Sequence, residues 1–103
     1  MDIDIQKNDN SYTVVLTGRL DTPAAVEAQK EFGVLMENAE QDITINCTEL
    51  KYISSSGLRL FLMLRKETTA KGGHLKILNI NNDIREVFKI TGFLNLFEIK
   101  NEG

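Results

Sequence analysis

Short β-rich runs alternate along this chain with segments of helical period, and this alternation limits the folds that it can adopt. Residues 1–5 alternate polar and apolar side chains, and residues 12–18 are rich in β-branched side chains. With the turn at 7–11 between them, the two runs predict a β-hairpin. Further β-rich runs at 42–47 and 74–80 are separated by helical segments. This order is typical of an α/β domain whose later strands lie parallel through crossover connections.

The first helical segment spans residues 19–39, where apolar residues recur every three or four positions. Asp21 or Thr22 can cap this helix, and Pro23 suits its first position, where a backbone N–H is not needed. Gly33 weakens a helix by about 1 kcal/mol relative to alanine. A glycine at this place therefore indicates that something packs closely against it.

Two more helices are predicted toward the carboxyl terminus. One runs from about Ser55 to Thr69 and ends before Gly72, and the other occupies residues 81–92, between an Asn or Asp cap and a glycine. Residues 93–99 form a final strand or an irregular apolar segment. The complete element order is β-β-α-β-α-β-α-β.

Composition excludes several classes of protein. At 103 residues, with 42% hydrophobic and 26% charged residues, the chain suits one soluble domain over residues 1–103. Its net charge of −3 argues against nucleic acid or an anionic membrane as the main partner. No apolar stretch is long enough for a membrane span, and the start does not resemble a secretion signal. The single cysteine, Cys47, fits a reducing cytoplasm, where we expect the protein to lie.

Three serines precede a glycine at the start of the second predicted helix, as Ser54, Ser55, Ser56 and Gly57. One hydroxyl is enough for an N-cap, so a first interpretation is one cap with spare hydroxyls in a tight turn. A second is a catalytic serine, which is disfavoured because the only histidine, His74, lies a helix away and no G-x-S-x-G elbow is present. A third is a phosphorylated hydroxyl at a helix N-terminus, whose added charge would break binding to a partner.

The helix behind the serines is more apolar than one buried face requires. Six of the seven residues at 58–64 are apolar, and one stripe, beginning at Leu58, faces the sheet. Leu60, Met63 and Leu64 fall partly outside this stripe. Either loops and the neighbouring helix cover them, or they form a docking face.

The remaining reactive residues suggest no catalytic or ligand site. Cys47 lies in a predicted buried strand, where a small apolar side chain fits, and His74 is predicted at a strand edge. No cluster of Cys, His, Asp and Glu has metal-ligand spacing, and the glycines at 72–73 lack the pattern of a nucleotide-binding loop. We therefore expect no catalytic residue, metal site or cofactor.

Three segments of the sequence resemble a known family. "LTGRLDT" at 16–22, "ITINCTELKYISSSGLRLF" at 43–61 and "GGHLKILNINNDIREVFKITGFLNLFEI" at 72–99 are similar to STAS domains of the anti-sigma factor antagonist type. The resemblance covers nearly the whole chain in the right order. It implies the STAS fold, a mixed sheet of four to five strands flanked by α-helices, and a regulatory protein that is not an enzyme.

The resemblance also implies roles for individual residues. Ser55 matches the serine that the family phosphorylates, with Ser54 and Ser56 as alternatives. Asp21 matches the acidic residue of the family's "G-x-L-D" loop near the partner surface. The residues expected at this surface are Asp21, Thr22, Ser54, Ser55, Ser56, Gly57, Leu58, Arg59, Leu60 and Met63.

The sequence departs from the family pattern at three positions. Ser54 and Asn46 stand where the family usually has aspartate, and both changes are expected to remove negative charge near the serine turn. Arg59 replaces a small residue, and a cation one turn into the helix can pair with a phosphate or with an acidic partner.

The function implied by the resemblance is that of an anti-sigma factor antagonist. Such a protein binds an anti-sigma factor that is also a serine kinase and so releases a sigma factor. Phosphorylation switches the binding off, and a PP2C-type phosphatase restores it. An alternative is an accessory subunit of an ABC-type lipid transporter, which would hold an ATPase without any phosphate. We expect a monomer or weak dimer.

Overall fold

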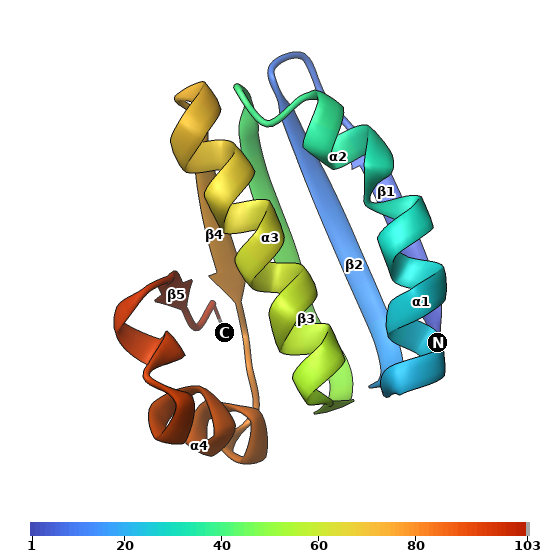
Figure 1. Cartoon of the computed structure of the whole chain (residues 1–103), viewed down its shortest axis with the longest axis vertical. Helices are drawn as coiled ribbons and strands as arrows, with labels where there is room; N and C mark the ends of the chain where they lie inside the picture. Colours follow the sequence, from blue (N-terminus) through green and yellow to red (C-terminus); the bar gives the residue numbers. More distant parts are fainter. Residues whose placement is uncertain (103) are drawn as a thin grey trace.

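The computed structural model describes residues 1–102 and contains a single sheet with helices on one face (Figure 1). The sheet strands are β1 (Asp2–Lys7), β2 (Ser11–Leu20), β3 (Asp42–Ile53), β4 (His74–Leu78) and β5 (Glu98–Lys100). The helices are α1 (Thr22–Glu31), α2 (Gly33–Glu37), α3 (Ser55–Lys71), α4 (Asn82–Thr91) and the 3₁₀ turn η1 (Phe93–Asn95). The order of elements predicted from the sequence is confirmed.

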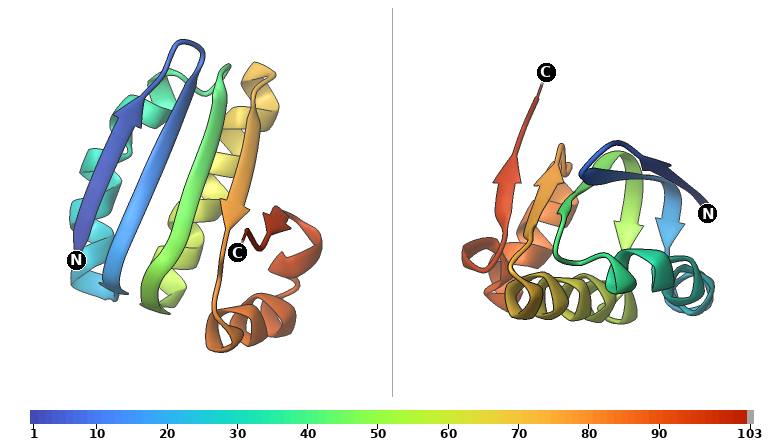
Figure 2. Two further views of the ribbon diagram at one scale, coloured as in Figure 1. Left: turned by 180° about the vertical axis from the view of Figure 1, so that it is seen from behind. Right: turned by 90° about the horizontal axis from the view of Figure 1, so that it is seen from above.

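The five strands lie in the order β1-β2-β3-β4-β5. Strands β1 and β2 form the predicted antiparallel hairpin, and every later pair is parallel, so the sheet is mixed. Helices α1, α2 and α3 cover one face of the sheet, whereas the opposite face carries no helix in the described part of the chain (Figure 2). Helix α4 lies beyond the carboxyl end of β4 (Figure 1).

The core lies between the sheet and the helices that cover it. Alternate residues of β2 and β3 point into this layer because successive side chains of a strand face opposite sides. The fully buried side chains of these strands include Val14, Leu16, Ile43, Ile45 and Cys47. Cys47 is thus a core residue, as its position in the sequence predicted.

Aromatic residues near the carboxyl terminus attach the last elements to the core. Phe88 of α4 lies edge-on to Phe61 of α3, with ring centroids 6.3 Å apart, and it also packs beside Phe93 and Phe97. Such edge-to-face pairs are favourable beyond the apolar area that they bury. The sequence predicted either a strand or an irregular segment at 93–99, and the structure contains both, a short 3₁₀ turn followed by a strand.

Two predicted boundaries are wrong. The strand predicted at 42–47 is longer in the structure, because β3 continues through residues 48–53 and pairs with β2 as far as Ile53. The first helix was expected to be continuous over 19–39, but the structure divides it at the buried Phe32. No atom lies within 4 Å of a methyl group added at Gly33. The expected close packing is absent there, and the low helix propensity of glycine fits the break instead.

Candidate functional site

The serine turn lies where two parallel strands end side by side. Leu20 ends β2 and pairs in register with Ile53, which ends β3. The next residues, Asp21 and Ser54, are the N-caps of α1 and α3. Because the strands are parallel, both strand-to-helix turns occur at the same edge of the sheet, which is a common place for functional residues in α/β folds.

Ser54 is the structural serine of the three. Its hydroxyl oxygen accepts a hydrogen bond from the backbone N–H of Gly57 over 3.1 Å, which is the N-cap interaction. Its own N–H donates to the carbonyl oxygen of Leu20 over 2.9 Å, which ties the turn to β2. Only 8% of Ser54 is exposed.

Ser55 and Ser56 differ from Ser54 in exposure. Ser55 is the first residue of α3 and is exposed, whereas Ser56 is half-buried. The first N–H groups of a helix have no intrahelical partner, so Ser55 lies beside free backbone donors. Of the three hydroxyls, that of Ser55 is the one presented to solvent on a turn that its neighbour holds in place.

Gly57 lets the turn pack directly onto the ends of the two strands. A methyl group added there would lie 2.8 Å from side-chain carbons of both Leu20 and Ile53. Real carbon atoms do not approach so closely, so any larger residue would push the start of α3 away from the sheet. The close packing at Gly57 therefore fixes the position of Ser55 relative to the ends of the two strands.

Asp21 and Thr22 lie on the neighbouring turn. Asp21 Oδ1 accepts a hydrogen bond from the N–H of Ala24 over 3.0 Å, so Asp21, not Thr22, caps α1. Pro23 occupies the second helical position instead of the first. Thr22 is exposed and lines a shallow cavity of about 140 Å³ between α1 and α3, together with Ser56 and Arg59 of α3. The structure thus brings the two sequence segments, 21–22 and 54–59, to one edge.

The apolar residues of α3 are mostly covered. Leu58, Leu60 and Leu64 are buried, because α1 packs beside α3 on one side and the sheet lies beneath it. The idea that Leu60 and Leu64 are exposed for docking is therefore wrong, and the alternative, in which the neighbouring helix covers them, holds. The side chains of Leu58 and Leu60 support the site from below, and only Met63 of this group reaches the surface, with 37% exposed.

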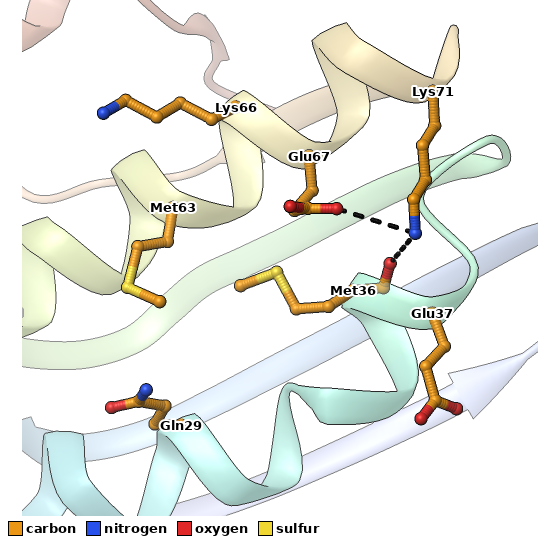
Figure 3. A pocket seen from close by; sticks show the side chains of 7 residues that line it. All are labelled: Gln29, Met36, Glu37, Met63, Lys66, Glu67 and Lys71. Atoms are coloured by element: carbon orange, nitrogen blue, oxygen red, sulfur yellow. Dashed lines mark hydrogen bonds and ion pairs between the residues drawn. The ribbon is translucent and has the colours of Figure 1, made fainter.

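Met63 belongs to a groove of about 480 Å³ between α3 and the α1–α2 pair (Figure 3). It points toward Met36 of α2, and the charged residues Glu37, Lys66, Glu67 and Lys71 also line the groove. Lys71 closes the far end, because its Nζ donates to the carbonyl oxygen of Met36 over 2.8 Å and lies 3.5 Å from Glu67. The groove shares Met63 and Gln29 with the smaller cavity beside Ser56, so the two cavities are adjacent along α3.

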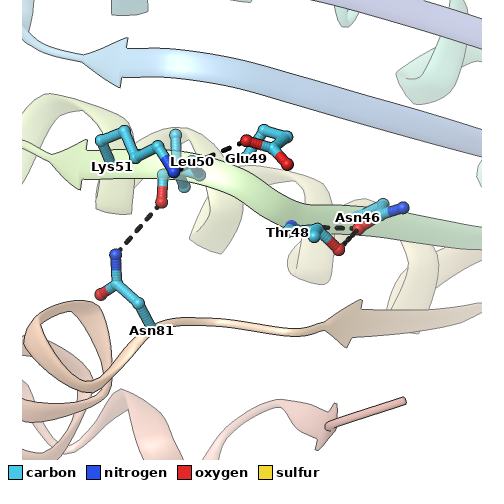
Figure 4. Close-up of polar contacts among 6 residues, drawn as sticks. All are labelled: Asn46, Thr48, Glu49, Leu50, Lys51 and Asn81. Atoms are coloured by element: carbon cyan, nitrogen blue, oxygen red, sulfur yellow. Dashed lines mark hydrogen bonds and ion pairs between the residues drawn. The ribbon is translucent and has the colours of Figure 1, made fainter. Parts of the chain in front are cut away.

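Asn46 does not belong to the serine turn. It lies in β3, eight residues before Ser54, which directly follows the strand, and this spacing corresponds to roughly 25 Å at the rise of a β-strand. Its Oδ1 accepts hydrogen bonds from the backbone N–H and the hydroxyl of Thr48, over 3.0 and 2.6 Å (Figure 4). The expectation that Asn46 removes negative charge near the serines is therefore wrong, and only the expectation for Ser54 remains.

Polar contacts also join the later elements to β3. Asn81 caps α4 through its Oδ1, which accepts from the N–H of Ile84 over 2.8 Å. Its Nδ2 donates to the carbonyl oxygen of Leu50 over 3.3 Å (Figure 4). Lys51 and Glu49 form an exposed ion pair of 3.5 Å on the same strand, which adds little to stability.

Two reactive residues lie away from this edge. Burial raises the pKa of the Cys47 thiol to about 12, so it remains protonated and unreactive at neutral pH. His74 is exposed at the start of β4, opposite Asp42 in register. Within residues 1–102, no three His, Cys, Asp or Glu side chains are grouped so that they could hold a metal ion. None of the helices described is long and apolar enough to cross a membrane.

Comparisons with known proteins agree with this geometry. Residues 2–102 match the family model described as the STAS domain. BtrV of Bordetella bronchiseptica, a candidate anti-sigma factor antagonist, is 30% identical over 98% of this chain and 87% of that protein. The anti-sigma-B factor antagonist of Bacillus subtilis is 29% identical over all of this chain and 95% of that protein.

Solved structures show the same fold. The phosphorylated form of the Bacillus cell fate determinant SpoIIAA superposes with a TM-score of 0.78 at 21% identity, covering 99% of this chain and 92% of that one. An anti-sigma factor antagonist from Mycobacterium paratuberculosis has a TM-score of 0.84 at 15% identity, over 96% and 84% of the two chains. At these identities the likeness establishes the fold.

Proposed function

The chain belongs to the STAS domain family, and from this premise we propose that it is an anti-sigma factor antagonist. In this proposal it binds an anti-sigma factor that is also a serine kinase and so releases a sigma factor. The kinase in turn phosphorylates Ser55, which ends the binding, and a PP2C-type phosphatase reverses the modification. The chain acts through binding and has no catalytic residue of its own.

One observation carries the proposal, namely the exposed hydroxyl of Ser55 on a rigid turn. A kinase must reach the hydroxyl that it modifies, and it must find that group in a defined position. The hydroxyl of Ser54 is nearly buried and engaged as the cap, and Ser56 is half-buried. Exposure therefore favours Ser55 over both alternatives.

Phosphorylation at this position changes the charge of the surface more than its shape. A phosphoserine carries close to two negative charges at neutral pH. Ser55 lies at the edge where the turns after β2 and β3 meet, and the next residue, Ser56, lines a shallow cavity with Thr22 and Arg59. A partner that rests on this edge would have to desolvate the phosphate, so binding would weaken without any refolding of the domain.

The replacement of aspartate by Ser54 is compatible with this switch. Serine and aspartate are both good N-caps, so the turn keeps its geometry with either residue. What changes is one negative charge beside Ser55. In the proposal, the kinase and phosphatase that act on this chain do not need that carboxylate to orient the hydroxyl.

The proposal is tested by comparing four baits in a pull-down from lysate of the source organism, read by mass spectrometry. Wild type and Ser55→Ala should both bring down a small ATP-binding kinase, whereas Ser55→Asp should not. Asn82→Asp is the matched control, because it adds the same charge at the exposed first residue of α4. It should bind as wild type does.

Binding of the purified kinase then gives the size of the effect. Ser55→Asp should weaken the affinity at least tenfold, or about 1.4 kcal/mol, in a calorimetric titration. Equal affinity of wild type and Ser55→Asp for the kinase would refute the phosphorylation switch. Recovery of a transporter ATPase on all the baits would support the accessory-subunit alternative instead.

A further inference from the structure

We propose that Arg59 holds the phosphate on Ser55, so that phosphorylation removes an exposed cation from the partner surface together with the free hydroxyl. This inference rests on the modification of Ser55 proposed above and adds the group that receives the phosphate. It concerns a contact within the chain, which is measurable whether or not a partner is present.

The two residues are neighbours on the surface of α3. Ser55 and Arg59 are four residues apart, the spacing at which side chains on a helix lie one above the other. Long side chains on a helix lean toward its N-terminus, over the preceding turn. This tendency favours a guanidinium that extends toward the serine turn. Arg59 also lines a shallow cavity with Thr22 and with Ser56, the residue next to Ser55.

Arg59 is exposed and, within residues 1–102, makes no ion pair or side-chain hydrogen bond. The other arginine of α3 differs, because Arg65 Nε donates to the carbonyl oxygen of Leu96 over 2.7 Å. Arg19 is also engaged, with its guanidinium carbon 4.3 Å from the centre of the Tyr52 ring. A phosphate on Ser55 would thus meet an arginine with all its donors available.

The charges around the turn favour this pairing. Helix α3 has no acidic residue in its first turn, and Glu67 is the first along it. Asp21, the N-cap of the neighbouring helix α1, keeps its negative charge, but its Oδ1 accepts from the N–H of Ala24 and it forms no ion pair with Arg59 within residues 1–102. Guanidinium groups bind phosphate oxygens through two parallel hydrogen bonds, which a single ammonium group does not reproduce.

The consequence is a switch with two parts. Without the phosphate, the edge presents a hydroxyl and a positive charge, which suits an acidic group on the partner. With the phosphate held by Arg59, the same edge presents net negative charge, and the arginine is no longer available. Arg59 is therefore a positioning residue for the phosphate and a contact residue for the unmodified state.

The test uses the full chain with phosphoserine installed at position 55 during translation. Phosphorus NMR then follows the second ionisation of the phosphate, whose pKa is about 6 in phosphoserine. Arg59→Gln should raise this pKa by at least about 0.3 unit, because it removes a cation that stabilises the dianion. Lys66→Gln is the control, because Lys66 is also an exposed cation of α3 but lies three turns from Ser55.

A second readout follows Arg59 itself. Its Nε–H resonance, assigned by its loss in Arg59→Gln, should shift on phosphorylation and again on titration of the phosphate, while that of Arg65 stays in place. In Arg59→Lys the phosphate pKa should lie between that of wild type and that of Arg59→Gln. An Arg59→Gln shift below about 0.1 unit, or an equal shift in Lys66→Gln, would overturn the proposal. These measurements need no kinase, so they can contradict the role of Arg59 without contradicting the proposed function, and the reverse also holds.

Discussion

The two ends of α3 differ in how their polar groups are used. At its carboxyl end the backbone turns through Gly72, whose φ of +83° is left-handed, and the N–H of Gly73 donates to the carbonyl oxygen of Thr68 over 2.9 Å. Lys71 is bound to both Glu67 and the backbone of α2. The polar groups at this end are used within the molecule.

The amino end is equally well packed beneath but differs at the surface. Gly57 and the capping hydroxyl of Ser54 hold the turn against Leu20 and Ile53. Above this base, Ser55 is exposed and Arg59 has no ion-pair partner within residues 1–102. The amino end therefore combines a closely packed base with exposed groups that have no partner within residues 1–102, which is the combination that the proposed binding site requires.

The largest effect is expected at the carboxyl end, from Gly73→Ala. The added methyl group would overlap the carbonyl oxygens of Ala39 and Gln41, which belong to the backbone and cannot rotate away. The free energy of unfolding should fall by about 3 kcal/mol, measured by urea denaturation. Gly33→Ala is the control, because no atom lies within 4 Å of its added methyl group, and it should not destabilise the protein.

At the amino end, Gly57→Ala should have a smaller effect. Its methyl group would meet side chains of Leu20 and Ile53, which can shift by changing rotamer. The loss of stability should be about 1–2 kcal/mol, in the same denaturation assay. If Gly57→Ala lost as much stability as Gly73→Ala, the side chains of Leu20 and Ile53 would not be able to shift, which would contradict this expectation.

Loss of the cap should follow next. Ser54→Ala removes the acceptor of the Gly57 N–H and should lower stability by about 1 kcal/mol. Ser54→Asp keeps a capping oxygen and should leave the thermal midpoint close to that of wild type. If both variants lost equal stability, the hydroxyl of Ser54 would not be acting as a cap.

The smallest changes in stability are expected from the exposed cations at the two ends of α3. Lys71→Ala breaks contacts to Met36 and Glu67 and should lower stability by roughly 0.5 kcal/mol, because all three groups are near the surface. Arg59→Ala removes no contact of these kinds and should change stability by less than that. A clear destabilisation by Arg59→Ala would show that this arginine already has a structural role, and would contradict the free state proposed for it.

The sequence alone determined much of this protein, because many of its signals act between near neighbours. The hairpin, a cap at Asp21 or Thr22, an Asn or Asp cap at the start of the last helix and the stop at Gly72 follow from local periodicity and from hydrogen bonds across three or four residues. The serine turn was visible for the same reason. Its assignment to a family depended on three segments in the right order.

Tertiary structure decided what each residue faces. The continuation of β3 to Ile53 depends on pairing with β2, and the burial of Leu60 depends on α1, neither of which local propensity records. Asn46 seemed close to the serines in sequence, yet an extended strand carries it far from them. Which serine is buried as a cap and which is exposed likewise became clear only when the ends of β2 and β3 met, because burial is set by residues distant in the chain.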